Sequence, residues 1–189
     1  MKAKIKMITA MITWGSMGIL VKQIDLPSGI IAFVRALIGM AFLFIMNFLI
    51  KRSFPKKELF TVKNKWILFA CGIALGVNWI FLFEAYKHTT VAVATLSYYI
   101  APILMVIFST IIFKEKMTVS KITLIIFSLL GLALISGIFD SNMASGNFTG
   151  ILFGFSAAIA YASFTLLGKQ IKGLDSMDST MIQFGISSL

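Results

Sequence analysis

The chain has 189 residues, of which 59% are hydrophobic and only 13% are charged, and its formal net charge is +10. Ordinary soluble domains carry roughly 25% charged residues, so this composition argues against a soluble domain and predicts a membrane protein. The positive charge does not indicate nucleic-acid binding, because the basic residues gather in particular connections between apolar segments.

Six apolar segments follow one another along the chain, and each is almost free of charge. Most reach the roughly 17–25 residues that a tilted helix needs to cross hydrocarbon, and the shorter first segment has flanking lysines that can extend to the interface. A buried bundle in a soluble protein would need polar faces at helical period, which these segments lack. The segments lie between Lys6 and Lys22, Asp25 and Lys51, Lys65 and Glu84, His88 and Lys114, Lys121 and Asp140, and Asp140 and Lys169.

A seventh apolar run covers residues 179–189. Its 11 uncharged residues would rise only about 16 Å as a helix, which is half of a bilayer core. We therefore expect an all-α polytopic membrane protein with six complete transmembrane helices and part of a seventh. This ending is expected of a truncated form of a longer protein.

The basic residues are distributed unevenly between the connections. Fourteen of the 17 Lys and Arg residues lie in the N-terminus and in the second, fourth and sixth connections, whereas the first and third hold one each. The positive-inside rule then places the N-terminus and the even-numbered connections in the cytoplasm. The first segment has no small-residue cleavage site, so it is expected to remain as a working helix.

Residues 155–171 repeat residues 8–24 at a fixed offset of 147 positions. Seven of the 17 aligned pairs are identical, both stretches close on Lys-Gln-Ile, and Trp14 is matched by Tyr161. Five apolar segments, counting the first, lie between the start of the first copy and the start of the second. Because five is an odd number of membrane crossings, the second copy must cross the membrane in the opposite direction. This predicts an inverted five-helix repeat, as in secondary transporters. We expect the first repeat over 1–139, a linker over 140–147 and the start of the second repeat over 148–189.

Short motifs occur in a fixed order along the first repeat. They are Trp14-Gly15-Ser16, Arg35 in AFVRALIG, Phe83 to Thr89, Tyr98 to Pro102, Glu115 in IIFKEKMT, and GLALISG. Together they resemble the EamA-type family of the drug/metabolite transporter superfamily over nearly all of residues 5–189. The resemblance implies ten helices, of which this chain completes six.

The same resemblance implies a function. It indicates a permease of the bacterial cytoplasmic (inner) membrane that moves small organic metabolites, such as amino acids or amphipathic compounds, by gradient-driven alternating access. The expected partners are a small-molecule solute and the lipid bilayer, with no nucleic acid. A homodimer is one way in which such a chain could form a complete carrier.

Three charged residues are candidates for structural or coupling roles. Arg35 lies about 10 Å inside the second segment, where an arginine either faces a partner or cavity or extends to the interface as a structural residue. Glu84 is the best partner for Arg35 by depth; it is interpreted either as a structural ion pair with Lys87 or as a proton carrier. Glu115 enters through the resemblance alone.

Polar and aromatic side chains within the segments could line a substrate path. Aromatic rings suit an amphipathic solute, and a buried amide needs hydrogen-bond partners, although the same residues could serve only packing. A proline in the fourth segment removes a backbone donor and predicts a helix break. Glycine pairs at GxxxG spacing predict close helix contacts. The path candidates are Trp14, Asn78, Trp79, Tyr98, Tyr99 and Tyr161; the break is at Pro102; the glycine pairs are Gly72/Gly76 and Gly150/Gly154.

The sequence lacks the parts of an enzyme. His88 is the only histidine and Cys71 the only cysteine, so neither a metal cluster nor a Ser-His pair is expected. A glycine-rich phosphate loop is also missing. We therefore predict no catalytic residue, no metal and no cofactor. The alternative function is a non-transporting membrane scaffold or a channel-like oligomer, which saturable flux would distinguish from a carrier.

Overall fold

The computed structural model describes residues 2–51, 62–114, 117–135 and 145–189. This part of the chain contains eight helices and no strand. The predicted all-α architecture is confirmed, and the count differs from the six complete helices and part of a seventh that the sequence predicted, because the fourth segment forms two helices. Their bounds are α1 Lys2–Lys22, α2 Ser28–Lys51, α3 Val62–His88, α4 Val91–Tyr98, α5 Ala101–Phe113, α6 Val119–Ile135, α7 Ser145–Gly168 and α8 Ser176–Ser187.

Within the described residues, the six predicted apolar segments are helical apart from a turn in the fourth. Four stretches are long and apolar enough to cross a membrane, and the first and fifth segments form shorter apolar helices within the described residues. The partial seventh segment corresponds to α8. Together with the composition, these helices make the chain a multi-pass membrane protein. The four long stretches are Ser28–Leu49, Lys65–His88, Val91–Phe113 and Phe148–Gly168.

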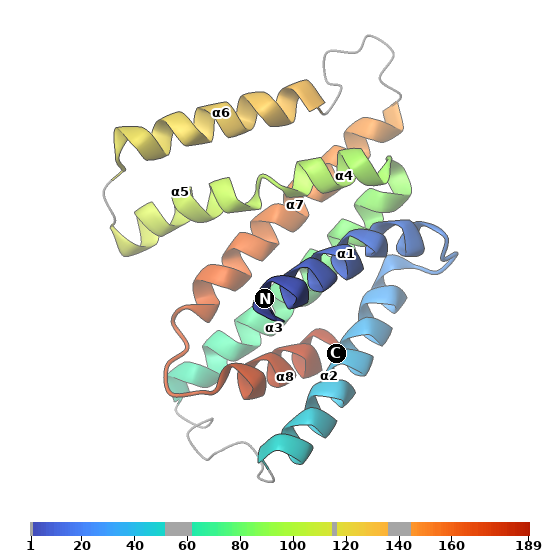
Figure 1. Cartoon of the computed structure of the whole chain (residues 1–189), viewed down its shortest axis with the longest axis vertical. Helices are drawn as coiled ribbons and strands as arrows, with labels where there is room; N and C mark the ends of the chain where they lie inside the picture. The colour runs from blue at the N-terminus through green and yellow to red at the C-terminus, as the bar shows by residue number, and fades with distance from the viewer. Residues whose placement is uncertain (1, 52–61, 115–116, 136–144) are drawn as a thin grey trace.

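Helix α3 lies at the centre of the bundle and packs against α1, α2, α4, α7 and α8. Its most extensive neighbour is α7, which runs beside it in Figure 1. Small side chains make this approach close: Ala157, Ala158 and Ala162 of α7 are fully buried. Small residues let two backbones come together where no water-driven hydrophobic effect favours larger ones.

Glycines at GxxxG spacing mark two helix contacts, as predicted. A Cβ on Gly72 would lie 2.5 Å from the Cβ of Ile186 in α8, and one on Gly76 would lie 3.4 Å from the Cβ of Ser187. On α7, a Cβ on Gly154 would lie 2.8 Å from the Cβ of Ser97. These glycines therefore fix how closely α3 meets α8 and how closely α7 meets α4.

The fourth apolar segment is broken, and Pro102 stands just after the break. Helix α4 ends at Tyr98, Tyr99 and Ile100 form a turn, and α5 begins at Ala101 with the proline in its first turn. A proline is favoured at that position because it has no N–H to donate. The predicted break is confirmed, and Figure 1 shows α4 and α5 as two separate rods.

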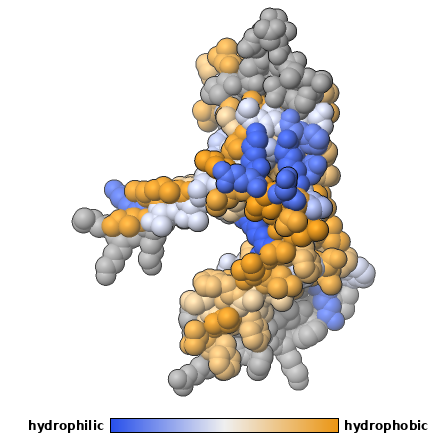
Figure 2. All heavy atoms as spheres, turned by 90° about the vertical axis from the view of Figure 1, so that its right-hand side faces the viewer, coloured by the Kyte–Doolittle hydropathy of each residue, from blue (hydrophilic) through white to orange (hydrophobic). Residues whose placement is uncertain are grey.

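The surface of the bundle is largely apolar. Exposed leucine, isoleucine and phenylalanine side chains occur on α1, α2, α5 and α6. Figure 2 shows apolar side chains over much of the face that it draws, with hydrophilic ones gathered in a limited area. A soluble monomer rarely exposes apolar patches of this extent, whereas a lipid-facing surface requires them.

Candidate substrate path and the Arg35 cavity

Asn78 connects three helices at the centre of the bundle. Its side chain is 2% exposed, and its amide nitrogen donates to the carbonyl of Ala157 in α7 at 2.8 Å and to the hydroxyl of Tyr98 in α4 at 3.5 Å. The ring of Tyr98 meets that of Tyr161 in α7, with centroids 5.7 Å apart. Three of the predicted path residues, Asn78, Tyr98 and Tyr161, therefore meet where α3 and α4 contact α7.

Arg35 lies in α2 beside the same part of α3. Its guanidinium carbon is 4.4 Å from the centroid of the Trp79 ring and 5.7 Å from that of Phe83. Nη1 donates to the sulfur of Met17 in α1. The ring of Trp79 in turn meets Phe184 of α8 edge-on at 5.2 Å. Arg35 is thus surrounded by aromatic faces and a polarizable thioether, which favour a guanidinium more than aliphatic groups do.

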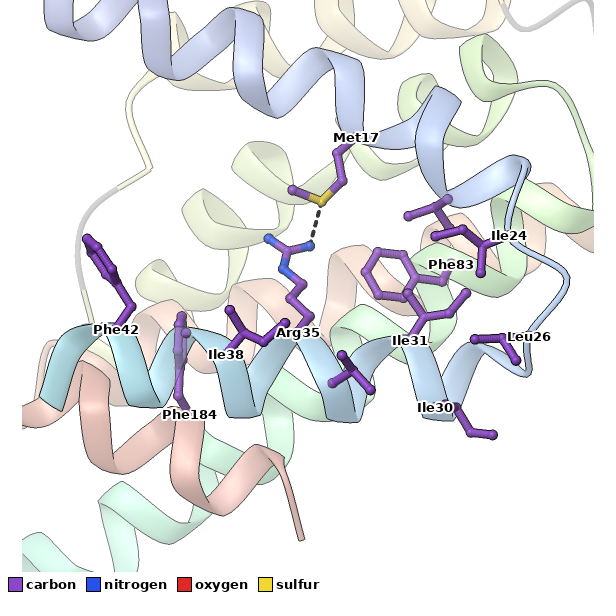
Figure 3. A pocket seen from close by; sticks show the side chains of 13 residues that line it. Met17, Ile24, Leu26, Ile30, Ile31, Arg35, Ile38, Phe42, Phe83 and Phe184 are labelled. Carbon is purple, nitrogen blue, oxygen red and sulfur yellow. Dashed lines mark hydrogen bonds between the residues drawn. The ribbon is translucent and has the colours of Figure 1, made fainter. Parts of the chain in front are cut away.

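A cavity of about 630 Å³ opens around Arg35 between α1, α2, α3 and α8. Figure 3 shows the Arg35 side chain rising from α2 toward Met17, with Phe83 on one side and Phe184 and Phe42 on the other. Arg35 is the one polar side chain among the described residues that line it. The lining consists of Met17, Val21, Ile24, Leu26, Ile30, Ile31, Val34, Arg35, Ile38, Gly39, Phe42, Phe83 and Phe184.

A second cavity, of about 410 Å³, lies between α7 and α8 and has a polar lining. Tyr161 contributes to it, so the aromatic cluster at Asn78 borders this cavity. Gln183, which is 5% exposed, lines it and donates to the hydroxyl of Ser179. The other residues of the lining are Phe164, Thr165, Gly168, Ile171, Leu174, Ser176 and Thr180.

Glu84 lies at the end of α3 and is held by neighbours other than Arg35. Its carboxylate accepts a hydrogen bond from the hydroxyl of Ser28 at the start of α2 and lies 3.4 Å from Nε2 of His88 one turn on. Lys87, the predicted partner, instead donates to the carbonyl of Leu26. These contacts place Glu84 at the α2–α3 corner, and they do not include Arg35; whether Glu84 has a structural or a coupling role stays a prediction.

The remaining predicted site residues lie apart from this region or outside the described residues. Tyr99 is 60% exposed in the turn between α4 and α5, so its ring is not part of the buried cluster. Trp14 belongs to α1, but its side chain is outside the described residues, and Glu115 is outside them altogether. Within the part of the chain that the structure describes, His, Cys, Asp and Glu form no group of three suited to a metal.

Sequence reasoning overlooked a buried polar contact between α2 and α8. Asn47, 4% exposed, donates to the carboxylate of Asp178, 7% exposed, at 2.6 Å. It also overlooked Met17 and Phe184 as neighbours of the Arg35 cavity. The contact of Asn47 could have been predicted, because an amide inside the apolar run IMNFLI requires a buried hydrogen-bond partner. Apolar residues in apolar helices offer no comparable signal.

Comparison with known proteins agrees with this architecture. Residues 1–137 match the model of the EamA-like transporter family. The chain is also similar to an uncharacterized transporter of Bacillus subtilis (strain 168), YxxF, with 36% identity over 185 residues. That alignment covers 97% of this chain but 59% of the relative, so the chain spans less than two thirds of the relative's length. No solved structure matches the chain. Because the family model matches well over half of the chain, the chain belongs to the EamA-like transporter family.

Proposed function

We propose that the protein is a permease that moves small organic solutes across the cytoplasmic membrane by gradient-driven alternating access. The observation that carries this proposal is the buried contact of Asn78 and Tyr98 with α7. It lies where helices of the first proposed repeat, α3 and α4, meet the first helix of the second. A site between two repeats can change its access when one repeat rocks against the other.

The arrangement of α1 and α7 supports an inverted repeat. These two helices carry the 147-residue sequence repeat, and they run in opposite directions in Figure 1. Their equivalent lysines occupy related positions: Lys22 donates to the carbonyl of Thr89 just beyond α3, and the ammonium of Lys169 lies 5.9 Å from the ring centroid of Phe113 at the end of α5. In each case a lysine reaches the C-terminal end of a neighbouring helix, where a positive charge is favoured.

We also propose that the N-terminus faces the cytoplasm, on the charge distribution. Single cysteines introduced in a Cys71→Ala background test this orientation in intact cells. A membrane-impermeant maleimide should label Asp25→Cys, in the first connection, and should not label Lys172→Cys, in the sixth. The reverse pattern would show that the orientation is inverted.

Solute counterflow distinguishes a carrier from a channel or scaffold. Proteoliposomes containing the protein would be loaded with one member of a panel of amino acids, monocarboxylates and amphipathic amines, and uptake of the labelled compound measured. A carrier should show saturable uptake that the internal solute accelerates, because the loaded site returns faster than the empty one. Uptake that never saturates would indicate a channel, and no uptake of any compound would favour a scaffold.

An Asn78 variant tests whether the transported solute uses the proposed path. Asn78→Leu removes the amide that bonds to Ala157 and Tyr98, so counterflow should fall severalfold. Ser128→Ala is the control, because this exposed hydroxyl of α6 bonds only within its own helix and its loss should leave counterflow unchanged. Full activity of Asn78→Leu would remove Asn78 from the path.

A further inference from the structure

The cavity of about 410 Å³ near the connection between α7 and α8 (Figure 1) has two unlike walls. Helix α7 contributes the rings of Tyr161 and Phe164, whose centroids are 6.2 Å apart, and the hydroxyl of Thr165. Its volume lies within the range of roughly 300–1,000 Å³ of small-molecule sites, which combine aromatic walls with a few placed polar groups. Every lining residue that α8 contributes is polar, and these residues are Ser176, Ser179, Thr180 and Gln183.

The polar groups of this cavity can accept hydrogen bonds from a solute. Gln183 is 5% exposed, and its amide nitrogen donates to the hydroxyl of Ser179 at 3.1 Å. Within the described part of the chain this is the only hydrogen bond of the Gln183 side chain, so its amide oxygen can still accept. The hydroxyls of Thr165 and Thr180 donate to carbonyls one turn earlier in their own helices. Because those hydrogens are already used, the two oxygens act toward a solute as acceptors.

The walls disfavour both ions and fully apolar compounds. No charged side chain is among the described residues that line the cavity. A carboxylate or an ammonium group would therefore lose its hydration there without a counter-charge. An apolar solute would displace water from the amide and the hydroxyls and leave them without partners. A neutral solute that carries several O–H donors avoids both penalties.

From these observations we propose that the cavity binds a neutral polyhydroxylated solute of the monosaccharide type. Its hydroxyl groups would lie on Thr180 and Gln183, and a C–H face of the sugar ring would lie against the aromatic wall of α7. The electron-rich face of an aromatic ring attracts such C–H groups. Tyr161 borders this cavity and also meets Tyr98 of the proposed path. That the bound solute is the transported one rests on the proposed function.

Binding of four matched compounds tests the assignment. The protein in nanodiscs of neutral lipid would be titrated with each compound, and binding measured by saturation-transfer NMR of the ligand, with empty nanodiscs as the correction. The compounds are glucose, the cation glucosamine, the anion glucuronate, and tetrahydropyran-2-methanol, which lacks most of the hydroxyls. We expect glucose to bind at least about tenfold more tightly than the other three, because each of them leaves a charge or a polar group uncompensated. Equal affinities, or no saturable binding of glucose at millimolar concentration, would overturn the proposal.

Three variants assign the preference to this cavity. Gln183→Leu removes the amide and should weaken glucose binding severalfold. Thr180→Asp places a carboxylate in the lining and should reverse the preference, so that glucosamine binds more tightly than glucose. Ser163→Ala is the control, because this hydroxyl of α7 donates to the carbonyl of Ile159 in its own helix and does not line the cavity. If Gln183→Leu does not fold, the reversal in Thr180→Asp carries the test. An unchanged order of affinities in Thr180→Asp, or unchanged glucose binding in a folded Gln183→Leu protein, would contradict the assignment.

Counterflow separates this inference from the function that it assumes. Saturable counterflow of other solutes, combined with equal binding of glucose and its analogues, would leave the transporter proposal standing and remove the sugar site. Selective binding of glucose without counterflow of any solute, glucose included, would support the site and count against transport.

Discussion

Gly39 on α2 lies directly against the ring of Phe184 on α8, which is one wall of the Arg35 cavity. A Cβ at this position would overlap the Cδ2–Cε2 edge of the ring. Phe184 cannot simply turn aside, because its ring also packs edge-on against Trp79. The absence of a side chain at residue 39 therefore sets the width of the cavity and the approach of α2 to α8.

We expect Gly39→Ala to lower the free energy of unfolding by about 1–3 kcal/mol, the usual effect of overpacking. Gly29→Ala, on the same helix, is the matched control: a Cβ there meets no atom within 4 Å, so the change should be neutral or stabilise by up to about 1 kcal/mol. Denaturant unfolding in mixed micelles measures both. Equal effects of the two variants would mean that the α2–α8 contact is not as close as described.

At the scale of single residues, the sequence predicted which residues in the helices are candidates for the site, but not which residues they contact. Asn78, Trp79 and Arg35 were recognised because polar or aromatic groups inside apolar helices are unusual. Their partners depend on how far each helix is shifted along its neighbour, and the hydropathy of the sequence does not show this shift. Ser28 and Arg35 are seven residues apart on α2, or about 10 Å. Since Ser28 reaches Glu84, Arg35 lies deeper and meets Trp79.

At the scale of the helices, the break between α4 and α5 is the feature with the clearest consequence. Pro102 cannot donate a hydrogen bond to the carbonyl four residues earlier, that of Tyr98. The hydroxyl of the same tyrosine accepts from Asn78. The break thus lies next to the buried cluster at the proposed path, where a bend can change the position of Tyr98 without unfolding either half of the helix.

Pro102→Ala restores the missing donor, and we expect it to straighten this segment and to reduce counterflow. Spin labels at Ala92 and Ile112, both exposed, would report the change. Their separation should lengthen toward the value for a continuous helix, about 30 Å between the two Cα atoms, and counterflow should fall severalfold. Unchanged flux in a straightened helix would show that the break is only architectural.

The sequence predicted the helices and this break, because apolar length and proline chemistry act locally. It also predicted the glycine contacts at Gly72/Gly76 and Gly150/Gly154. It could not indicate which helices those glycines meet, since GxxxG spacing does not specify a partner. The pairing of α3 with both α7 and α8 follows from packing over long sequence separations, and so does the Arg35 cavity, to which four helices contribute.

For the whole molecule, the contacts of α3 join the two proposed repeats. Helices α7 and α8, which open the proposed second repeat, pack on α3 of the first through alanines and glycines, together with ring contacts between Phe81 and Phe153 and between Trp79 and Phe184. Where the contact is made by small residues, packed helices can slide past one another by small distances. Alternating access requires such motion, with α3 moving against α8 while each repeat keeps its own internal packing.

A reversible cross-link between α3 and α8 tests this central claim. A Cβ on Gly76 would lie 3.4 Å from the Cβ of Ser187, close to the mean of about 3.8 Å in disulfides. In a Cys71→Ala background, oxidised Gly76→Cys/Ser187→Cys should lose counterflow, and reduction should restore it, while each single-cysteine variant stays active under both conditions. Full counterflow by the cross-linked protein would contradict transport by movement of one repeat against the other.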